Sequence, residues 1–288
     1  MDLGISRRSF LTTAGVVISG IAITGLAACT EAVPVIPEPS PSPTGSIRDQ
    51  LDQALGVISA GNRNFGVFIT DVHSGRSYSY SGDYASQSAS MAKPMIVAMA
   101  LRKARAEGHP LSAEHSEQAR KAITNSDNTA ASALWDYAGY QDYPVLAAEL
   151  GMKHTHLDEN KADQWSWTWT TPSDQVILAT ALATGDTTAL TKDECAYIYT
   201  LMGEVEADQT WGVGQPKSDQ VAVHLKNGWV QFKSSDGLWA VNSMGTVSGD
   251  GRDYRMCVMT RDQDFPTGRE LTSTVGKWVF AILGSGTL

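Results

Sequence analysis

The sequence predicts a mixed α/β fold, and two pairs of β-prone segments carry the strand part of this prediction. The first pair is Phe65 to Thr70 with Ser77 to Tyr80, and the second is Leu238 to Val247 with Tyr254 to Thr260. A short turn joins the members of each pair, His-Ser-Gly-Arg in the first and Gly-Asp-Gly in the second. Each pair therefore predicts an antiparallel hairpin. Helical patterns precede the first hairpin and follow the second.

Apart from the helices that follow the chemical motifs described below, four helices are predicted from composition, periodicity and capping residues. Ile47 to Ala60 is amphipathic, and Leu271 to Leu283 forms the last helix. Pro172 to Ala183 follows Thr171, a good N-cap, and Lys192 to Met202 is also helix-like. We find no internal repeat.

The first residues of the chain are typical of an export signal. Ser6-Arg7-Arg8-Ser9-Phe10-Leu11 matches a twin-arginine signal, and an apolar stretch follows it. Leu26-Ala27-Ala28-Cys29 resembles a lipoprotein cleavage box, so we expect Cys29 to become the lipidated first residue. An uncleaved membrane anchor is the alternative, which changes the attachment but not the compartment.

These signals divide the chain into three parts. We expect residues 1–28 to be a signal peptide, 29–46 a Pro- and Ser-rich tether, and 47–288 the catalytic domain. About 240 residues are enough for one well-cored or two-lobed domain. The domain would sit on the outer face of the cytoplasmic membrane, held by the lipid.

Charge and cysteine content exclude some functions. The formal net charge is −9, and loss of the leader removes Arg7, Arg8 and Asp2, two positive charges and one negative, which gives −10. No basic stripe is visible, which argues against a nucleic-acid partner. Cys195 and Cys257 lack an activating neighbour, and we expect buried free thiols, although a disulfide is permitted outside the cell. We expect no cofactor and a monomer.

The first chemical motif is Ser90-Met91-Ala92-Lys93. Helix formers follow it, and Pro94 fits only in a first helical turn, so the helix should begin near residues 88–90. Ser90 would then lie among unpaired N–H groups that favour a developing anion, with Lys93 one turn further on the same face. The alternative is an ordinary N-cap serine and a solvated lysine.

The second motif is Ser126-Asp127-Asn128, ahead of an Ala-rich helical run from Thr129 to Tyr137. Ser126 and Asn128 could face Ser90, with the hydroxyl relaying a proton and the amide gripping a substrate. Alternatively, Asp127 or Asn128 only caps the helix.

The third motif is Lys226-Asn227-Gly228, which follows the β-branched alternation of Val221 to Leu225. Lys226 should end a buried strand, and Gly228 would allow a ligand backbone to lie alongside. The alternative is a simple turn, because Asn-Gly is a strong hairpin signal.

These three motifs, in this order, resemble those of the penicillin-recognising serine enzymes, above all the class A β-lactamase branch. The resemblance runs from about Ile47 onward and implies a sheet flanked by helices plus an all-helical lobe at about residues 86–205. It also implies an oxyanion hole from the backbone N–H groups of Ser90 and Trp229. The residues implied are Ser90, Lys93, Ser126 and Lys226 for catalysis, and Asn128, Asn227, Gly228 and Trp229 for binding a small-molecule or peptide substrate.

The chain departs from the family pattern around the substrate carboxylate. Asn227 stands where the family carries Thr or Ser, and Leu238 to Val247 contains no arginine for that carboxylate. Lys233 could substitute for it. Ser90 and Ser126 are also closer in sequence than in typical class A enzymes, which predicts a reduced helical lobe.

A second departure concerns the Ω-loop glutamate that drives deacylation in class A enzymes. Its position falls near Lys161, and the neighbouring Glu159 and Asp163 are out of register. We therefore expect no deacylating base of the class A kind.

Three further groups of residues each have a structural and a functional interpretation. His154, His156 and Asp158 could hold a metal, but no third histidine follows, and we expect no metal site. Trp165, Trp167 and Trp169 alternate and could share one face as a sugar platform; packing of the shortened Ω loop is the favoured alternative. His224 shares the strand face of Lys226 and is expected to be a satisfied core histidine.

Three functions remain open at this point. The first is a β-lactamase-like serine hydrolase that forms an acyl-enzyme at Ser90 with weak or atypical deacylation. The second is a D,D-peptidase or penicillin-binding protein acting on cell-wall peptides. The third is a non-catalytic lipoprotein that binds cell-wall material in a degenerate cleft.

Overall fold

A computed structural model describes residues 45–61, 64–215, 218–232 and 237–288 of the chain. The predicted signal peptide, Cys29, most of the tether and Lys233 lie outside these residues. Within the described residues, the helices are too short or too polar for any of them to cross a membrane.

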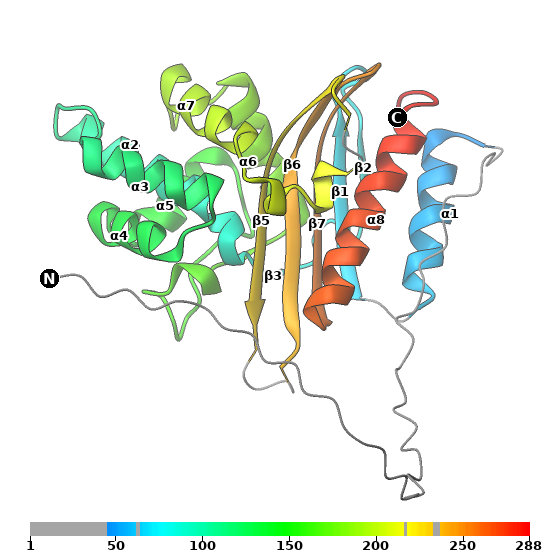
Figure 1. Cartoon of the computed structure of the whole chain (residues 1–288), viewed down its shortest axis with the longest axis horizontal. Helices are drawn as coiled ribbons and strands as arrows, with labels where there is room; N and C mark the ends of the chain where they lie inside the picture. Colours follow the sequence, from blue (N-terminus) through cyan, green and yellow to red (C-terminus); the bar gives the residue numbers. More distant parts are fainter. Residues whose placement is uncertain (1–44, 62–63, 216–217, 233–236) are drawn as a thin grey trace, which may run out of the picture. The chain divides into compact units, whose positions relative to one another are not determined.

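A five-stranded antiparallel sheet forms the centre of the described domain, in the order β2-β1-β7-β6-β5 (Figure 1). Its strands are β1 (Asn64–Asp71), β2 (Ser77–Tyr80), β5 (Val221–Gln231), β6 (Trp239–Gly249) and β7 (Arg252–Gln263). The β1–β2 and β6–β7 hairpins pair as the sequence predicted. Strand β5 lies at the edge of the sheet and pairs with β6 alone.

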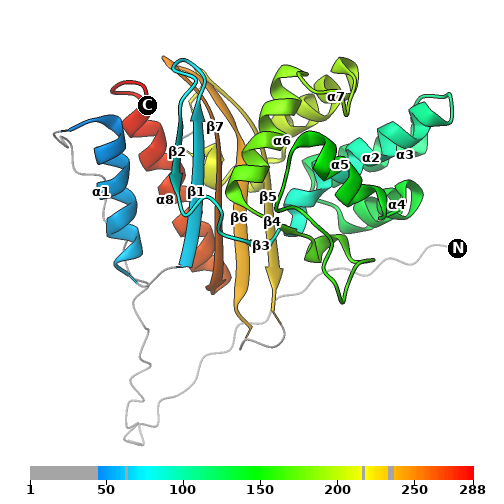
Figure 2. The same ribbon diagram turned by 180° about the vertical axis from the view of Figure 1, so that it is seen from behind.

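Two helices, α1 (Ile47–Ser59) and α8 (Phe265–Leu283), cover one face of the sheet (Figures 1 and 2). A capping box of Ser46 with Asp49 fixes the start of α1. Asp264 is the N-cap of α8, which therefore begins at Phe265, six residues before the predicted start at Leu271. Apolar residues of both helices pack on the alternate residues Val67 and Ile69 of β1.

The other face of the sheet carries a lobe of helices (Figure 2). These are α2 (Lys93–Ala106), α3 (Ala113–Thr124), α4 (Asn128–Ala138), α5 (Asp142–Leu150), α6 (Pro172–Thr184) and α7 (Lys192–Gly203). The lobe has a separate hydrophobic core, and α6 packs it against β1, β6 and β7. Helices α3 and α5 were not predicted, because α3 is polar and α5 is short and carries a proline in its first turn.

Short elements connect the lobe to the sheet. The 3-10 turns are η1 (Ala89–Ala92), η2 (Trp165–Trp167), η3 (Ala207–Gln209) and η4 (Gly212–Gly214). Two-residue strands β3 (Ser86–Gln87) and β4 (Trp169–Thr170) pair with each other. This small ladder joins the segment just before η1 to the segment just after η2.

The prediction for the third motif was wrong in one respect. Lys226 does not end a strand, because β5 continues to Gln231, and the alternative of a turn at the Asn-Gly pair is excluded for the same reason. Asn227 pairs with Ser243 and Gly228 with Asn242 in the β5–β6 ladder. The predicted fold class, an antiparallel sheet flanked by helices plus a helical lobe, is confirmed. Cys195 and Cys257 are buried and free.

Candidate active site

Ser90 lies in η1, the tight turn that leads into α2. The helical segment begins at Ala89, within the predicted range, but its first turn is the 3-10 helix η1 and the α-helix α2 starts at Lys93. Ala89 has a φ of 48°, in the left-handed region that a residue with a Cβ rarely adopts. The turn is held from outside, because Ser88 N donates to the Thr168 carbonyl at 2.7 Å. Ser90 itself is buried, with 6% of its surface exposed.

Lys93 is fully buried, and its ammonium has three polar contacts in the second motif. Its Nζ donates to the Ser126 carbonyl at 2.5 Å and to Asn128 Oδ1 at 2.8 Å. It also lies 3.2 Å from Ser126 Oγ. Three acceptors fix the lysine beside the Ser90 turn, so Lys93 is not an ordinary solvated residue.

Ser126 connects the two lysines. Its Oγ accepts from Lys226 Nζ at 2.9 Å as well as from Lys93. The backbone at Ser126 is left-handed, with φ of 57°, and Asp127 caps α4 by accepting from Ala130 N. Asp127 therefore does what its capping interpretation predicted, while Ser126 points into the site.

Strand β5 brings the third motif to the same place. Lys226 is 1% exposed and also donates to the Asn227 carbonyl at 3.0 Å. At Gly228 the strand passes so close to η1 that an added Cβ would lie 2.9 Å from Ser90 N and 2.7 Å from Met91 N. Only glycine allows this approach. The backbone of Trp229 follows directly, while its side chain packs on Trp211 and Phe265.

Burial changes the chemistry of both lysines. Desolvation lowers the pKa of Lys93 from 10.5 to about 7, although the nearby Asp127 acts in the opposite direction. Burial also lowers the pKa of Lys226 well below 10.5, and the neighbouring Lys93 adds to that effect. Lys93 can therefore be neutral near neutral pH, which a general base requires.

An indole ring covers the side of Lys93 that faces the segment between α5 and α6. The Trp165 ring centroid lies 4.9 Å from Lys93 Nζ, and its Nε1 donates to Ser132 Oγ at 3.1 Å. Glu159 and Asp163, the carboxylates of this segment considered above, are exposed. Within the described residues, no carboxylate forms an ion pair with Lys93 or Lys226.

The three alternating tryptophans do not share one face, because Trp165 to Trp167 form a 3-10 turn rather than a strand. Trp167 packs edge-on against Phe232 at 5.9 Å, with Lys161 Nζ 3.0 Å from its ring centroid. The ring of Trp169, a residue of β4, stacks on the ring of His156. The rings thus hold the segment against β5 and the body of the lobe, as the packing alternative predicted.

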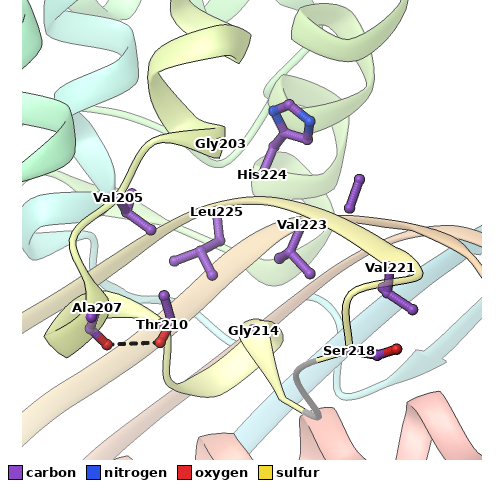
Figure 3. Close-up of a pocket in the computed structure, with 11 residues that line it drawn as sticks. Gly203, Val205, Ala207, Thr210, Gly214, Ser218, Val221, Val223, His224 and Leu225 are labelled. Carbon is purple, nitrogen blue, oxygen red and sulfur yellow. Dashed lines mark hydrogen bonds between the residues drawn. The ribbon is translucent and has the colours of Figure 1, made fainter.

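His224 is held by α7. Its ring stacks on Tyr199 at 3.7 Å, and its Nδ1 donates to the Tyr199 carbonyl at 2.8 Å. A cavity of about 520 Å³ lies beside this histidine, bounded by Val221 to Leu225 of β5 and by the η3–η4 segment (Figure 3). The cavity adjoins the first half of β5, before Lys226.

The comparisons with known proteins identify the family and agree with the fold. A family model described as the β-lactamase enzyme family matches residues 111–283, more than half of the chain. No curated protein matches the chain significantly. The family match places the chain in the superfamily of penicillin-recognising serine enzymes, and within it the chain belongs to the β-lactamase enzyme family.

Solved structures show the same fold at low identity. A class A β-lactamase of Bacteroides cellulosilyticus is 16% identical with a TM-score of 0.69, over 84% of this chain and 99% of that one. The TLA-1 extended-spectrum β-lactamase is 17% identical with a TM-score of 0.71, over 83% and 100%. A β-lactamase of Sphaerobacter thermophilus is 18% identical with a TM-score of 0.65, over 82% and 97%.

Proposed function

We propose that the protein is a serine acyl-transfer enzyme in which Ser90 attacks a lactam, ester or amide carbonyl. The observation that supports this most strongly is the single hydrogen-bond network of Lys93, Ser126 and Lys226 beside the Ser90 turn. A serine is a weak nucleophile unless a nearby base accepts its proton. Lys93 begins the helix that directly follows the Ser90 turn, and burial lowers its pKa to about 7.

In the proposed acylation, the Ser90 oxygen bonds to the carbonyl carbon while its proton passes to Lys93. The N–H groups of Ser90 and Trp229 would hold the developing oxyanion, because η1 and β5 bring their backbones together at Gly228. The bond to the leaving group then breaks. Ser126, which contacts both lysines, would deliver a proton to the departing nitrogen or oxygen.

Deacylation is proposed to be slow. The Trp165 ring lies 4.9 Å from Lys93 Nζ, and it belongs to the segment that the sequence resemblance matches to the Ω loop. An apolar ring there offers no acceptor to activate a water. This observation favours the second candidate function, a D,D-peptidase or penicillin-binding protein, whose acyl-enzyme persists.

Mass spectrometry of the intact protein tests the proposal. Wild type and Ser90→Ala are incubated with benzylpenicillin, its methyl ester and an acyl phosphonate, and we expect an adduct on Ser90 that the variant lacks. Ser116→Ala, which alters a serine on α3 remote from the motifs, is the matched control and should be labelled normally. Absence of an adduct with all three reagents would favour the non-catalytic lipoprotein instead.

The lifetime of the adduct separates the two enzymatic candidates. Loss within seconds, with turnover of a chromogenic lactam, supports a β-lactamase. An adduct that persists for many minutes supports a penicillin-binding protein.

We also propose that the chain is exported by the twin-arginine pathway and anchored through Cys29. The support is the sequence of residues 6–29. Metabolic labelling with an alkyne fatty acid should tag the wild type in the membrane fraction and not Cys29→Ala. Substitution of Arg7 and Arg8 by lysine should retain the precursor in the cytoplasm.

A further inference from the structure

Two buried asparagines lie at neighbouring positions of β5 and β6, and their side chains point to opposite faces of the sheet. Asn227 Nδ2 donates to the Gln209 carbonyl at 2.7 Å, toward the η3–η4 segment. Asn242 Nδ2 donates to the Gln87 carbonyl at 2.8 Å, on the side of the helical lobe. Asn242 belongs to none of the three motifs, yet it bonds the segment that leads directly into the turn of Ser90.

Both ends of the Asn242 amide are held. Its Oδ1 accepts from Thr260 N of β7 at 3.3 Å, and none of the residue is exposed. The register of β6 on β7 shifts between Trp239 and Val241, immediately before this asparagine. Such a shift disrupts the ladder locally and can redirect a side chain. With its oxygen bonded to β7, the amide has one orientation, in which the NH2 group points at the Gln87 carbonyl.

The turn that carries Ser90 needs support from outside. The left-handed backbone of Ala89, with φ of 48°, persists only where the surrounding structure holds it. The turn lies on Gly228 of β5, and Gly228 pairs directly with Asn242 in the β5–β6 ladder. The glycine allows the turn to come close to the sheet, and the asparagine bonds the turn there.

A second anchor comes from the segment between α5 and α6. Ser88 N donates to the Thr168 carbonyl at 2.7 Å, and the hydroxyls of the two residues lie 2.5 Å apart. Asn242 and Thr168 thus hold two consecutive residues of the chain from different elements. The bond from Asn242 differs in that it ties the turn to the sheet, whose strand β5 carries the backbone N–H of Trp229.

We infer that Asn242 is a positioning residue for the reaction of Ser90, acting through its bond to the Gln87 carbonyl. The inference rests on the proposed acyl transfer. In that reaction the N–H groups of Ser90 on η1 and Trp229 on β5 must point at the same oxygen, so their separation depends on how η1 is fixed to the sheet. Asn242 fixes it without touching the substrate or the reacting atoms.

Asn242→Leu, which keeps nearly the same shape and removes both bonds, tests this role. The maximal rate of Ser90 acylation at saturating acyl phosphonate should fall about 10- to 100-fold, somewhat less than when an oxyanion donor is removed outright. The reagent concentration that gives half of the maximal rate should change by less than about threefold, since the lost interaction acts in the transition state. An unchanged maximal rate, or a loss confined to the half-saturating concentration, overturns the inference.

Thr246→Val is the matched control. Thr246 lies on the same strand and the same face, and its Oγ1 bonds Tyr199 OH at 2.8 Å, so the isosteric valine also removes a buried link between β6 and the lobe. Urea denaturation should show a loss of stability in both variants, while Thr246→Val acylates within about twofold of wild type. Equal losses of acylation in the two variants would mean that Asn242 acts through stability alone and would overturn the inference.

Asn242→Asp gives a pH profile that a general loss of stability would not produce in the folded protein. A protonated carboxyl can donate to Gln87 and accept from Thr260 as the amide does, whereas a carboxylate can only accept and repels the carbonyl oxygen. Burial raises the pKa of such a carboxyl. The acylation rate relative to wild type should therefore be close to one at pH 5 and about tenfold lower at pH 8, with circular dichroism checking the fold at both. A ratio that is independent of pH overturns the inference, and this variant decides it if Asn242→Leu misfolds.

Hydrogen exchange separates this inference from the proposed function. The backbone amides of residues 86–92 should exchange faster in Asn242→Leu than in wild type or Thr246→Val, whether or not Ser90 reacts. If wild type forms no adduct and the exchange still differs, acyl transfer is overturned and the anchoring of the turn by Asn242 stands. If adducts form and neither the exchange nor the acylation rate differs, the inference alone is overturned.

Discussion

The two faces of the central sheet pack in different ways. Toward α1 and α8, the contacts come from aliphatic and aromatic side chains such as Leu55, Ile69 and Val279. Toward the helical lobe, the hydrophobic core is interrupted at β5 by the fully buried Lys93 and the nearly buried Lys226. The first face needs nothing but apolar burial for stability. The second keeps two lysines where burial is unfavourable, which is expected of a site that uses them.

The largest effect is expected on the rate of acylation when Lys93, the proposed base on the lobe side of the sheet, is replaced. Lys93→Ala should lower the rate of Ser90 acylation about 10²- to 10⁴-fold, the usual contribution of general acid–base catalysis. Time-resolved mass spectrometry with an acyl phosphonate or a penicillin measures the rate. Lys103→Ala, on the same helix with a partly exposed side chain, is the matched control and should acylate at the wild-type rate. Equal rates for the two variants would contradict the role of Lys93.

On the face of the sheet covered by α1 and α8, a substitution should lower stability and leave the acylation rate nearly unchanged. Leu55→Ala removes a fully buried side chain from α1 and should lower the free energy of unfolding by about 2–5 kcal/mol. Urea denaturation measures the loss, and the acylation rate should stay within about twofold of wild type. Val57→Ala on the same helix, 48% exposed, should change stability by less than about 0.5 kcal/mol. A large loss of acylation in folded Leu55→Ala would show that the two faces are coupled.

The buried lysine also predicts how stability depends on pH. Because the pKa of Lys93 is lowered to about 7, the unfolded chain binds a proton that the native lysine has released between pH 7 and 10.5. The unfavourable contribution of Lys93 is therefore complete below about pH 7 and disappears as the pH approaches 10.5. Lys93→Met should stabilise the protein at pH 6 by on the order of a few kcal/mol, and this advantage should shrink by pH 9.5.

Urea denaturation of Lys93→Met and wild type at pH 6, 8 and 9.5 measures this difference, in which other titrating groups cancel. The same pKa predicts that wild-type acylation rises with pH through about 7. A stability difference that does not change with pH would show that Lys93 titrates near its ordinary value in the native protein.

The smallest effect is expected at Trp165. Trp165→Ala opens space beside Lys93, so water should enter and the acyl-enzyme should decay severalfold faster. Trp165→Phe keeps an apolar ring and should retain the wild-type lifetime. The decay of the Ser90 adduct, followed by mass spectrometry after removal of free reagent, provides the measurement. A longer lifetime in Trp165→Ala would mean that the indole assists deacylation.

Local sequence signals predicted the first face well. The alternation in β1, the hairpin turns and the amphipathic pattern of α1 are short-range features, and the structure contains them within a few residues of their predicted bounds. The register of β5 was less predictable. Asn-Gly favours a turn locally, but pairing along the whole of β6 keeps it in the strand, which is a long-range effect.

For the second face, the motifs predicted which residues meet but not what surrounds them. Ser126 with Lys93 and Lys226 could be anticipated from the order of three short motifs. The contact of Trp165 with Lys93 and the bonds from Asn227 to Gln209 and Trp211 could not, because they join loops with no periodic or spacing signal. Those contacts are made by Asn227 and by the Ω-loop segment, the two places where the chain departs from the family pattern.

The two-residue ladder of β3 and β4 has a mechanical consequence. Gln87 pairs with Trp169, and Ser88 bonds Thr168 through both backbone and side chain, so the nucleophile turn and the segment carrying Trp165 are linked at adjacent residues. A ligand that pushes the tryptophan aside therefore also pulls on the backbone that aims the serine. The space beside Trp165 and the orientation of Ser90 are therefore not independent in this protein. A substitution that enlarges the first will need a second substitution that restores the position of the serine.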